Sequence, residues 1–337
     1  MAQSLFFLFQ SYRLYSCMKK ITIFIAGHNG MVGKSIYKNL LGKKIGELIT
    51  ADRSKLNLEN INKVDEFIKK NKPDVVINCA GKVGGILANK TYPTEFLNEN
   101  IQIQTNLIKS AYLNNIEHFI NLGSSCIYPK KSKQPIKEDY LLTGSLEKTN
   151  EAYALAKIVG LKMCEFYNSQ YNKSYLTLMP CNLYGPNDNF DNKNSHFLPS
   201  LIKKVIENKQ KGNKSIEIWG TGKPKREVMH VDDLAEAISF ILKKKIKNDV
   251  KLLKLIKKSS IINVGSGNEH SIESFANIIC KILNNKNKLS FNKNYPDGTM
   301  RKILDSSLIN NLGWKAKIKI TSGLSETINW YKKNRLN

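Results

Sequence analysis

Tyr153 and Lys157 are the two side chains whose types and spacing most directly offer proton transfer. Residues four apart lie on one face of a helix, so the phenol and the ammonium would be neighbours there. An ammonium stabilises a phenolate, and we therefore expect Lys157 to lower the pKa of Tyr153 towards the working range of a proton donor. An exposed pair on a helix surface has the same spacing, so the pair needs support from its surroundings.

A glycine-rich loop supplies part of that support. It follows the apolar run Ile21–Ala26 and opens a helix-like stretch, which places bare backbone amides where a pyrophosphate could bind. An ordinary tight turn would look similar, but the flanking strand and helix favour dinucleotide binding. The predicted phosphate-binding loop consists of Gly27, His28, Asn29, Gly30, Met31, Val32 and Gly33.

Two neighbouring residues at the end of the second predicted strand give opposite indications about the dinucleotide. Asp52 could accept a hydrogen bond from the ribose 2′-hydroxyl of NAD, whereas Arg53 could pair with the 2′-phosphate of NADP. The local sequence therefore leaves both cofactors open.

A serine completes the set around the tyrosine and the lysine. Ser124 directly follows the predicted strand His118–Leu122 and its glycine, Gly123. It stands upstream of Tyr153 by the interval expected for the serine of a short-chain dehydrogenase. Serine, tyrosine and lysine behind a glycine loop form a far more specific pattern than the tyrosine and lysine alone.

Two further residues have side chains capable of acid–base chemistry. Cys126 is adjacent to the serine, and His196 lies in the stretch Asn194–Phe197. Without other context a buried cysteine is usually a small hydrophobic residue, and a single histidine is usually a surface or capping residue. An acid–base role can therefore be assigned to these two side chains only from the sequence around them.

The elements that must position these residues alternate between short apolar strands and amphipathic helices, the pattern of a parallel sheet. Up to residue 179 the predicted elements are Ile21–Ala26, Met31–Leu41, Leu48–Thr50, Ile61–Lys70, Val75–Asn78, Thr94–Asn114, His118–Leu122, Glu151–Tyr171 and Tyr175–Met179. We predict an α/β fold with a Rossmann-like, doubly wound parallel sheet.

After Pro180 the pattern loosens into loops and isolated elements. These are predicted at Phe197–Asn208, Ile216–Trp219, Val231–Lys244, Ile261–Val264, Ser271–Leu283 and Gly323–Lys333. We expect residues 18–179 to form the NADP-binding Rossmann domain and residues 180–337 to form mainly a smaller C-terminal α/β lobe for substrate. The two lobes should pack closely around a cleft.

The chain of 337 residues carries 53 Lys and Arg against 28 Asp and Glu, a net charge of +25. Phosphates, nucleic acids and anionic membranes are therefore all conceivable partners. The lysines are scattered instead of forming a stripe, which argues against a specific nucleic-acid site. The densest patch, residues 243–258, suits an amphipathic helix or a surface insertion, and a solvated face explains it better than membrane binding.

The six cysteines form no C-x-x-C pair and no cluster with histidine, so we predict neither a metal site nor a disulfide framework. A reducing, cytoplasmic location fits. Residues 1–17 contain the apolar run Leu5–Phe9, but the charged Arg13 follows it, the reverse of a secretory signal, and the run is too short to span a bilayer. We expect a disordered extension, or an upstream start before a natural Met18.

From Lys20 to the C terminus the chain resembles the GDP-L-fucose synthases, a family of extended short-chain dehydrogenases/reductases. The matching stretches are Phe24–Gly33 (FIAGHNGMVG), Gly81–Leu87 (GKVGGIL), Leu122–Lys130 (LGSSCIYPK), Asn182–Asn189 (NLYGPNDN), Asn194–Phe197 (NSHF), Arg226–Asp233 (REVMHVDD) and Pro296–Lys302 (PDGTMRK). Ser-Ser-Cys-Ile-Tyr-Pro together with Asn-Ser-His is far more specific than the spacing of tyrosine and lysine.

The resemblance implies 3,5-epimerisation of GDP-4-keto-6-deoxy-D-mannose followed by NADPH-dependent reduction at C4. By it, Ser124, Tyr153 and Lys157 match the family's catalytic triad, and Cys126 and His196 match its base and acid. The implied NADP(H) contacts are Gly27 to Gly33, Arg53, Leu122, Gly123, Ser124, Ser125, Lys157, Pro180, Cys181, Asn182, Leu183 and His196. The implied contacts with the GDP-sugar are Lys204, Trp219, Arg226 and Asp297. The family also implies a homodimer joined through helices of the cofactor domain.

Two other interpretations remain open. A sibling enzyme of the same fold, such as a sugar 4-epimerase, dehydratase or reductase with another base or hexose, would move hydride at C4 alone and need neither Cys126 nor His196. A non-catalytic dinucleotide-binding or nucleic-acid-binding protein would use the positive charge, but the intact Ser124, Tyr153 and Lys157 argue against it.

Overall fold

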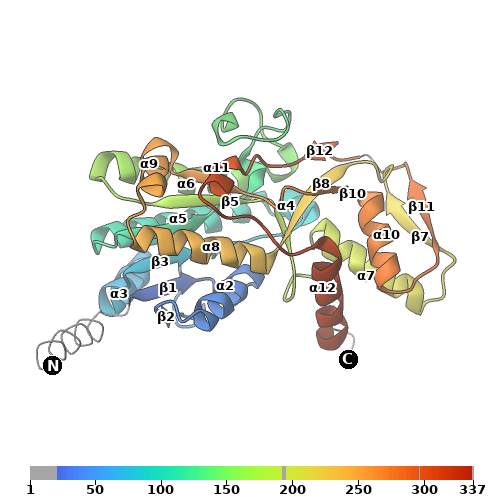
Figure 1. Ribbon diagram of the computed structural model, residues 1–337, viewed down its shortest axis with the longest axis horizontal. Helices are drawn as coiled ribbons and strands as arrows, with labels where there is room; N and C mark the ends of the chain where they lie inside the picture. Colours follow the sequence, from blue (N-terminus) through green and yellow to red (C-terminus); the bar gives the residue numbers. More distant parts are fainter. Residues whose placement is uncertain (1–20, 192–194, 296, 336–337) are drawn as a thin grey trace, which may run out of the picture.

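A six-stranded parallel sheet forms the centre of the first lobe, with the strand order β2-β1-β3-β4-β5-β9 (Figure 1). The computed structural model describes residues 21–191, 195–295 and 297–335. The strands are β1 (Thr22–Ala26), β2 (Glu47–Ile49), β3 (Val75–Asn78), β4 (His118–Leu122), β5 (Leu176–Pro180) and β9 (Ile261–Val264). The predicted Rossmann-like, doubly wound sheet is confirmed.

Helices cover both faces of this sheet, because alternate residues of its strands point to opposite sides and both sets are apolar. Ile23 and Ile25 of β1 belong to one core cluster, whereas Phe24 and Ala26 belong to another. The helices of this lobe are α2 (Met31–Gly42), α3 (Ile61–Asn71), α4 (Ile86–Thr91), α5 (Pro93–Leu113), α6 (Glu151–Tyr171), α8 (Val231–Ile246), α9 (Val250–Ser259) and α11 (Ser307–Asn311). Within it, α2 packs against α8, and α5 packs against both α3 and α6.

The second lobe lies at one end of the molecule and contains two small sheets and the helices that pack on them (Figure 1). In the larger of the two sheets, β8 pairs with β6, β10 and β12; in the other, β7 pairs in parallel with β11. Its elements are β6 (Asn182–Tyr184), α7 (Phe197–Gln210), β7 (Ser215–Trp219), β8 (Lys225–His230), β10 (Glu269–Ser271), α10 (Ile272–Ile282), β11 (Lys288–Asn292), β12 (Arg301–Lys302) and α12 (Ile320–Arg335). A separate apolar cluster, which includes Ile202, Ile218, Phe275 and Ile328, forms its core.

The chain does not stay in the second lobe after residue 180. Strand β9 returns to the large sheet beside β5, and α8 packs on α2, so the sheet is completed by residues well beyond the predicted boundary. The reason is physical: Ile261 and Ile262 are buried, and a parallel strand between helices needs apolar residues on both faces. The division at 18–179 and 180–337 therefore marks where the chain first enters the second lobe.

The lysine-rich stretch 243–258 is helical, as its spacing predicts, and forms the end of α8 and most of α9. Lys245 differs from its neighbours because it is buried, and its ammonium donates a hydrogen bond to the Ser174 hydroxyl (3.0 Å). The expected extension at residues 1–17 lies outside the described residues. Within the described ranges no helix is both long and apolar enough to cross a membrane.

Candidate active site

The glycine loop between β1 and α2 has a geometry that only glycine permits at two positions. Gly27 adopts a φ of +83°, and a Cβ there would lie 2.6 Å from the Ala80 backbone nitrogen. At Gly33 a Cβ would lie 2.2 Å from the Gly27 carbonyl oxygen. Gly30 caps α2 without any side-chain hydrogen bond, so the first amides of the helix stay available to an anion. The loop therefore fits a dinucleotide pyrophosphate.

Polar side chains tie this loop to the end of β2. The Asn29 amide donates to Asp52 Oδ1 (2.6 Å), and the His28 Nε2 lies 3.4 Å from the same oxygen. Arg53 points elsewhere: it pairs with Glu59 (2.7 Å), while 77% of its side chain remains exposed. Asp52 thus has partners within the loop, and Arg53 can still reach a ligand.

Three predicted catalytic residues come together where β4 ends and α6 begins. The Lys157 ammonium is buried and donates a hydrogen bond to the Leu122 carbonyl (2.9 Å). It lies 5.7 Å from the centre of the Tyr153 ring. The Ser124 hydroxyl is hydrogen-bonded with Tyr153 and also accepts from the Cys126 backbone N–H (3.4 Å). Serine, tyrosine and lysine thus form one contiguous group.

The expected effect of Lys157 on the tyrosine is wrong for this structure. Burial raises the pKa of Tyr153, and its hydrogen bond with Ser124 opposes this rise only in part. The Lys157 ammonium points at Leu122 O instead of the phenol oxygen, and burial lowers its own pKa to about 8. Tyr153 is therefore a protonated donor in this state of the protein.

Cys126 lies buried beside this group, in the short 3₁₀ turn Ser125–Ile127 that follows β4. Burial raises the pKa of its thiol, and the positive charge of Lys302, the Ser124 hydroxyl and Lys157 lower it. The sequence did not indicate Lys302 as a site residue, although Lys302 is the last residue of the matching stretch Pro296–Lys302. Its position depends on the pairing of β12 with β8, for which no local pattern exists.

His196 stands at the N-cap position of α7, and its side chain is largely exposed, although partial removal of water lowers the pKa of its imidazole. Within the described ranges no hydrogen bond or ion pair joins it to Ser124 or Tyr153. Its neighbour Asn194 lies outside the described residues.

A further group of predicted NADP(H) contacts lies where two adjacent strands of the sheet, β4 and β5, end and where β6 begins. Most of them are buried, and a Cβ at Gly123 would clash with Met179, so the backbone there is tightly packed. Cys181 is buried, and burial raises the pKa of its thiol well above the usual range, which makes it unreactive. The residues of this group of predicted NADP(H) contacts are Leu122, Gly123, Ser124, Ser125, Pro180, Cys181, Asn182 and Leu183.

The four predicted GDP-sugar contacts gather in the second lobe. The Lys204 ammonium lies 5.1 Å from the centre of the Trp219 ring and donates to the Glu217 carbonyl (2.9 Å). Asp297 accepts from the backbone N–H (2.9 Å) and hydroxyl (2.6 Å) of Thr221, just beyond β7. Arg226 is near enough for Asp297 to affect its pKa, which burial lowers. Trp219 is 59% exposed, so it is not the core residue that a tryptophan usually is.

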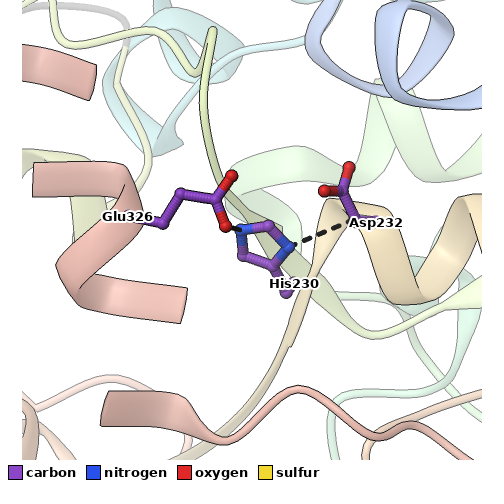
Figure 2. Close-up of side chains that lie close together, drawn as sticks. All are labelled: His230, Asp232 and Glu326. Atoms are coloured by element: carbon purple, nitrogen blue, oxygen red, sulfur yellow. Dashed lines mark hydrogen bonds and ion pairs between the residues drawn. The ribbon is translucent and has the colours of Figure 1, made fainter. Parts of the chain in front are cut away.

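Figure 2 shows a different group, His230, Asp232 and Glu326, whose ligand atoms lie close enough together for a metal ion. His230 Nδ1 accepts a hydrogen bond from the Asp232 backbone N–H (3.3 Å), and Nε2 lies 3.7 Å from a Glu326 oxygen. Because Nδ1 is an acceptor, the neutral ring carries its proton on Nε2 and offers no lone pair there to a metal. The group is a helix cap of α8 that also contacts α12.

A surface hollow lined in part by Pro73, Asn115 and His118 lies at the amino ends of β3 and β4. Ligands of open α/β sheets bind at the opposite edge, outside the carboxyl ends of the strands. The hollow is therefore separate from the group around Ser124.

The sequence pattern of the NAD dependent epimerase/dehydratase family matches residues 23–265, more than half of the chain. The chain belongs to this family. The family pattern includes the glycine loop, the serine, tyrosine and lysine, and β9, the last strand of the large sheet.

Curated relatives and solved structures place the chain more closely within the epimerase/dehydratase family. GDP-L-fucose synthase 1 of Arabidopsis thaliana is 44% identical over 319 residues, which cover 95% of each chain. GDP-L-fucose synthase of Escherichia coli (strain K12) is 42% identical over 318 residues, covering 94% of this chain and 98% of the relative. The solved structure of a GDP-mannoheptose C4 reductase from Campylobacter jejuni with NADP bound has a TM-score of 0.84 and 36% identity, and the match covers 94% of this chain and 99% of that one.

Proposed function

We propose that the protein is a GDP-L-fucose synthase, which inverts C3 and C5 of GDP-4-keto-6-deoxy-D-mannose and then reduces C4 with NADPH. The observation that carries the proposal is the place of Cys126, buried against Ser124 and within reach of the charges of Lys157 and Lys302. An enzyme that reduces C4 alone has no use for a second acid–base group next to its serine and tyrosine. The relatives named GDP-L-fucose synthase match nearly the whole chain, which supports the same function.

Reduction at C4 needs a proton donor at O4, and Tyr153 has that role in the proposal. Its phenol is protonated because burial raises its pKa, and the hydrogen bond with Ser124 orients it. Lys157 lies 5.7 Å from the centre of the ring and donates a hydrogen bond to the Leu122 carbonyl, so in the proposal it holds the end of β4 beside the tyrosine. When bound, NADPH supplies the hydride that reduces C4.

Epimerisation uses the acidity of the carbons that flank the C4 ketone. Removal of a proton from C3 or C5 gives an enolate, whose oxygen accepts hydrogen bonds from the Ser124 and Tyr153 hydroxyls. Reprotonation from the other side of the ring inverts the centre, and so requires a base and an acid on opposite faces. We assign these roles to Cys126 and His196, which come from different elements, the turn after β4 and the start of α7.

The cofactor in the proposal is NADP(H), held by Gly27 to Gly33 with the pyrophosphate at the start of α2. The side chain of Arg53 is largely exposed, and a doubly charged 2′-phosphate would compete well with its present partner, Glu59. Asp52 already accepts from Asn29, which leaves it less available to the 2′-hydroxyl of NAD. These contacts favour NADPH over NADH.

The GDP-sugar would be bound by the second lobe. Lys204 and Arg226 are cations that suit the diphosphate, Trp219 offers an aromatic plane, and Asp297 suits hydroxyls or guanine. The proposal also places the enzyme in the cytoplasm as a homodimer. The five cysteines in the described part of the chain are all free, which suits a reducing compartment.

The proposal is tested by incubating the protein with GDP-4-keto-6-deoxy-D-mannose and NADPH in D₂O, with absorbance and NMR as readouts. We expect NADPH oxidation and GDP-L-fucose that carries deuterium at C3 and C5. Cys126→Ala should lose most of the deuterium incorporation, whereas Cys280→Ala, in the core of the second lobe, should keep it.

Two results would contradict the proposal in different ways. Reduction without deuterium at C3 and C5 would make the protein a C4 reductase, the activity in the name of the Campylobacter jejuni structure. Binding of NADPH and GDP without turnover of this sugar would indicate a different hexose.

A further inference from the structure

Two aromatic side chains form an exposed stack in the second lobe. The rings of Trp219 and Tyr295 have their centroids 4.3 Å apart and are inclined by only 12°. Trp219 is 59% exposed and Tyr295 is 42% exposed. Trp219 ends β7, and β11 pairs with it so that Asn292 lies opposite Trp219 and the chain then turns to Tyr295. Strand pairing, not sequence proximity, brings the two rings together.

The groups around this stack are those that a nucleotide diphosphate requires. The Lys204 ammonium lies 5.1 Å from the Trp219 ring centre and is fixed by the Glu217 carbonyl. Asp297, two residues after Tyr295, is held by Thr221, two residues after Trp219. The structure thus fixes a cation over Trp219 and holds a carboxylate by the turn that follows this residue.

A stacked pair of large aromatic rings that remains exposed indicates a binding surface. Other large rings of this lobe, such as Phe190 and Phe275, are buried in its core. Because the Lys204 ammonium lies over the Trp219 ring, a further flat ring would stack on the exposed Tyr295 ring. A purine covers more of such a surface than a pyrimidine, so the stack would favour a two-ring base.

We propose that Trp219 and Tyr295 act together as the base-stacking surface of the nucleotide site, with Tyr295 as a residue that selects a purine over a pyrimidine. This inference rests on the proposed function for the identity of the base, guanine. It adds Tyr295, which no sequence motif indicates, to the predicted contacts. Its phenol ring is the functional part, so phenylalanine should replace it.

The test measures nucleotide binding without catalysis, by tryptophan fluorescence and calorimetry with GDP and UDP. Tyr295→Ala should weaken GDP binding about tenfold, as expected for the loss of one base-stacking contact, and should change UDP binding much less. Tyr295→Phe should bind GDP like the wild type. Tyr37→Ala, at an exposed tyrosine on α2, is the matched control and should leave GDP binding unchanged.

Kinetics separate this role from a general effect on folding. In Tyr295→Ala the KM for the GDP-sugar should rise about tenfold with kcat and the Kd for NADPH unchanged. In the double variant Trp219→Ala/Tyr295→Ala the loss should be smaller than the sum of the two single losses, because the rings act as one surface.

Unchanged or tighter GDP binding by Tyr295→Ala would overturn the inference, since the Tyr295 ring would then contribute nothing to binding or would compete with the base. An equal loss of GDP and UDP binding would also overturn it. If GDP binds with the expected dependence on Tyr295 but GDP-4-keto-6-deoxy-D-mannose is not converted, the proposed reaction fails and the base-stacking surface stands.

Discussion

At the scale of single residues, the charge of Lys302 decides how readily Cys126 can act as a base. Burial raises the pKa of the Cys126 thiol, and Lys302 is the strongest of the groups that oppose this rise. A thiol accepts a proton only after ionisation, so the rate of proton removal should follow the thiolate fraction.

We therefore predict that Lys302→Met slows deuterium exchange at the substrate carbons C3 and C5 about tenfold near pH 7.5, because loss of the positive charge raises the pKa of Cys126 further. The loss should shrink as the pH rises. Lys302→Arg keeps the charge and should restore most of the rate. A variant with a uniform loss at every pH would show that Lys302 acts by some means other than its charge.

Asp188 is a second residue whose proton equilibrium has a measurable consequence, in this case for stability. It is buried, one carboxyl oxygen accepts from the Asn189 N–H (2.7 Å), and the other has no hydrogen-bond partner within the described residues. Burial raises the pKa of Asp188 to about 7. Its unfolded pKa is the ordinary 3.8, so between the two values the folded state binds more protons than the unfolded state.

The free energy of unfolding should therefore fall as the pH rises from about 4 to about 7, and Asp188→Asn should remove that part of the fall. We predict that the variant gains at least about 1 kcal/mol relative to the wild type between pH 5 and pH 8, measured by urea unfolding. Glu66→Gln, at an exposed carboxyl of α3, is the control and should show no such pH dependence. If the free energies of unfolding of Asp188→Asn and the wild type differed by the same amount at pH 5 and at pH 8, the raised pKa of Asp188 would be contradicted.

At the scale of elements, the close packing of α12 on the rest of the molecule depends on Gly323. A Cβ there would lie 2.3 Å from the Tyr184 hydroxyl and 3.1 Å from the His230 ring, so the helix approaches β6 and β8 more closely than any side chain allows. We predict that Gly323→Ala destabilises the protein by about 1–3 kcal/mol through overpacking.

The measurement is the urea midpoint, with Gly42→Ala as the matched control. Gly42 is the last residue of α2, and a Cβ at this position would disturb no contact, since nothing lies within 4 Å of it. Alanine there should be neutral or slightly stabilising. If both variants had the same midpoint, the packing argument for α12 would be wrong.

The elements that sequence alone predicts are those with a strong local pattern. The bounds of β3, β4, β9 and α6 agree with the expected ranges. Strands β6, β10 and β12 were missed because two or three residues carry no periodicity, and β8 was missed because its burial does not alternate. The glycine loop and the short motifs that carry Ser124 and Tyr153 are each local in sequence, which is why the sequence predicts them. Lys302 and Tyr295 reach their places only through pairing with distant strands.

At the scale of the whole molecule, the face formed by α5 and α6 is where a second copy should bind. The two helices pack side by side and expose apolar groups at Leu113, Leu155, Phe166 and Tyr171. Leu155 and Phe166 are eleven residues apart, close to three helical turns, so they lie on the same stripe of α6. Phe166 alone is 60% exposed. A stable dimer that buries this stripe would remove these apolar side chains from water.

We predict that the wild-type protein has the mass of a dimer at micromolar concentration in light scattering, and that Phe166→Glu shifts it to the monomer. A charge in the centre of a buried apolar interface costs several kcal/mol, enough to raise the Kd of the dimer by at least about a hundredfold. Leu41→Glu, an equally exposed position on α2, should leave the dimer intact. Because α6 also carries Tyr153 and Lys157, a monomer that keeps full activity would show that the interface does not support the active site, whereas a dimeric Phe166→Glu variant would exclude this face as the interface.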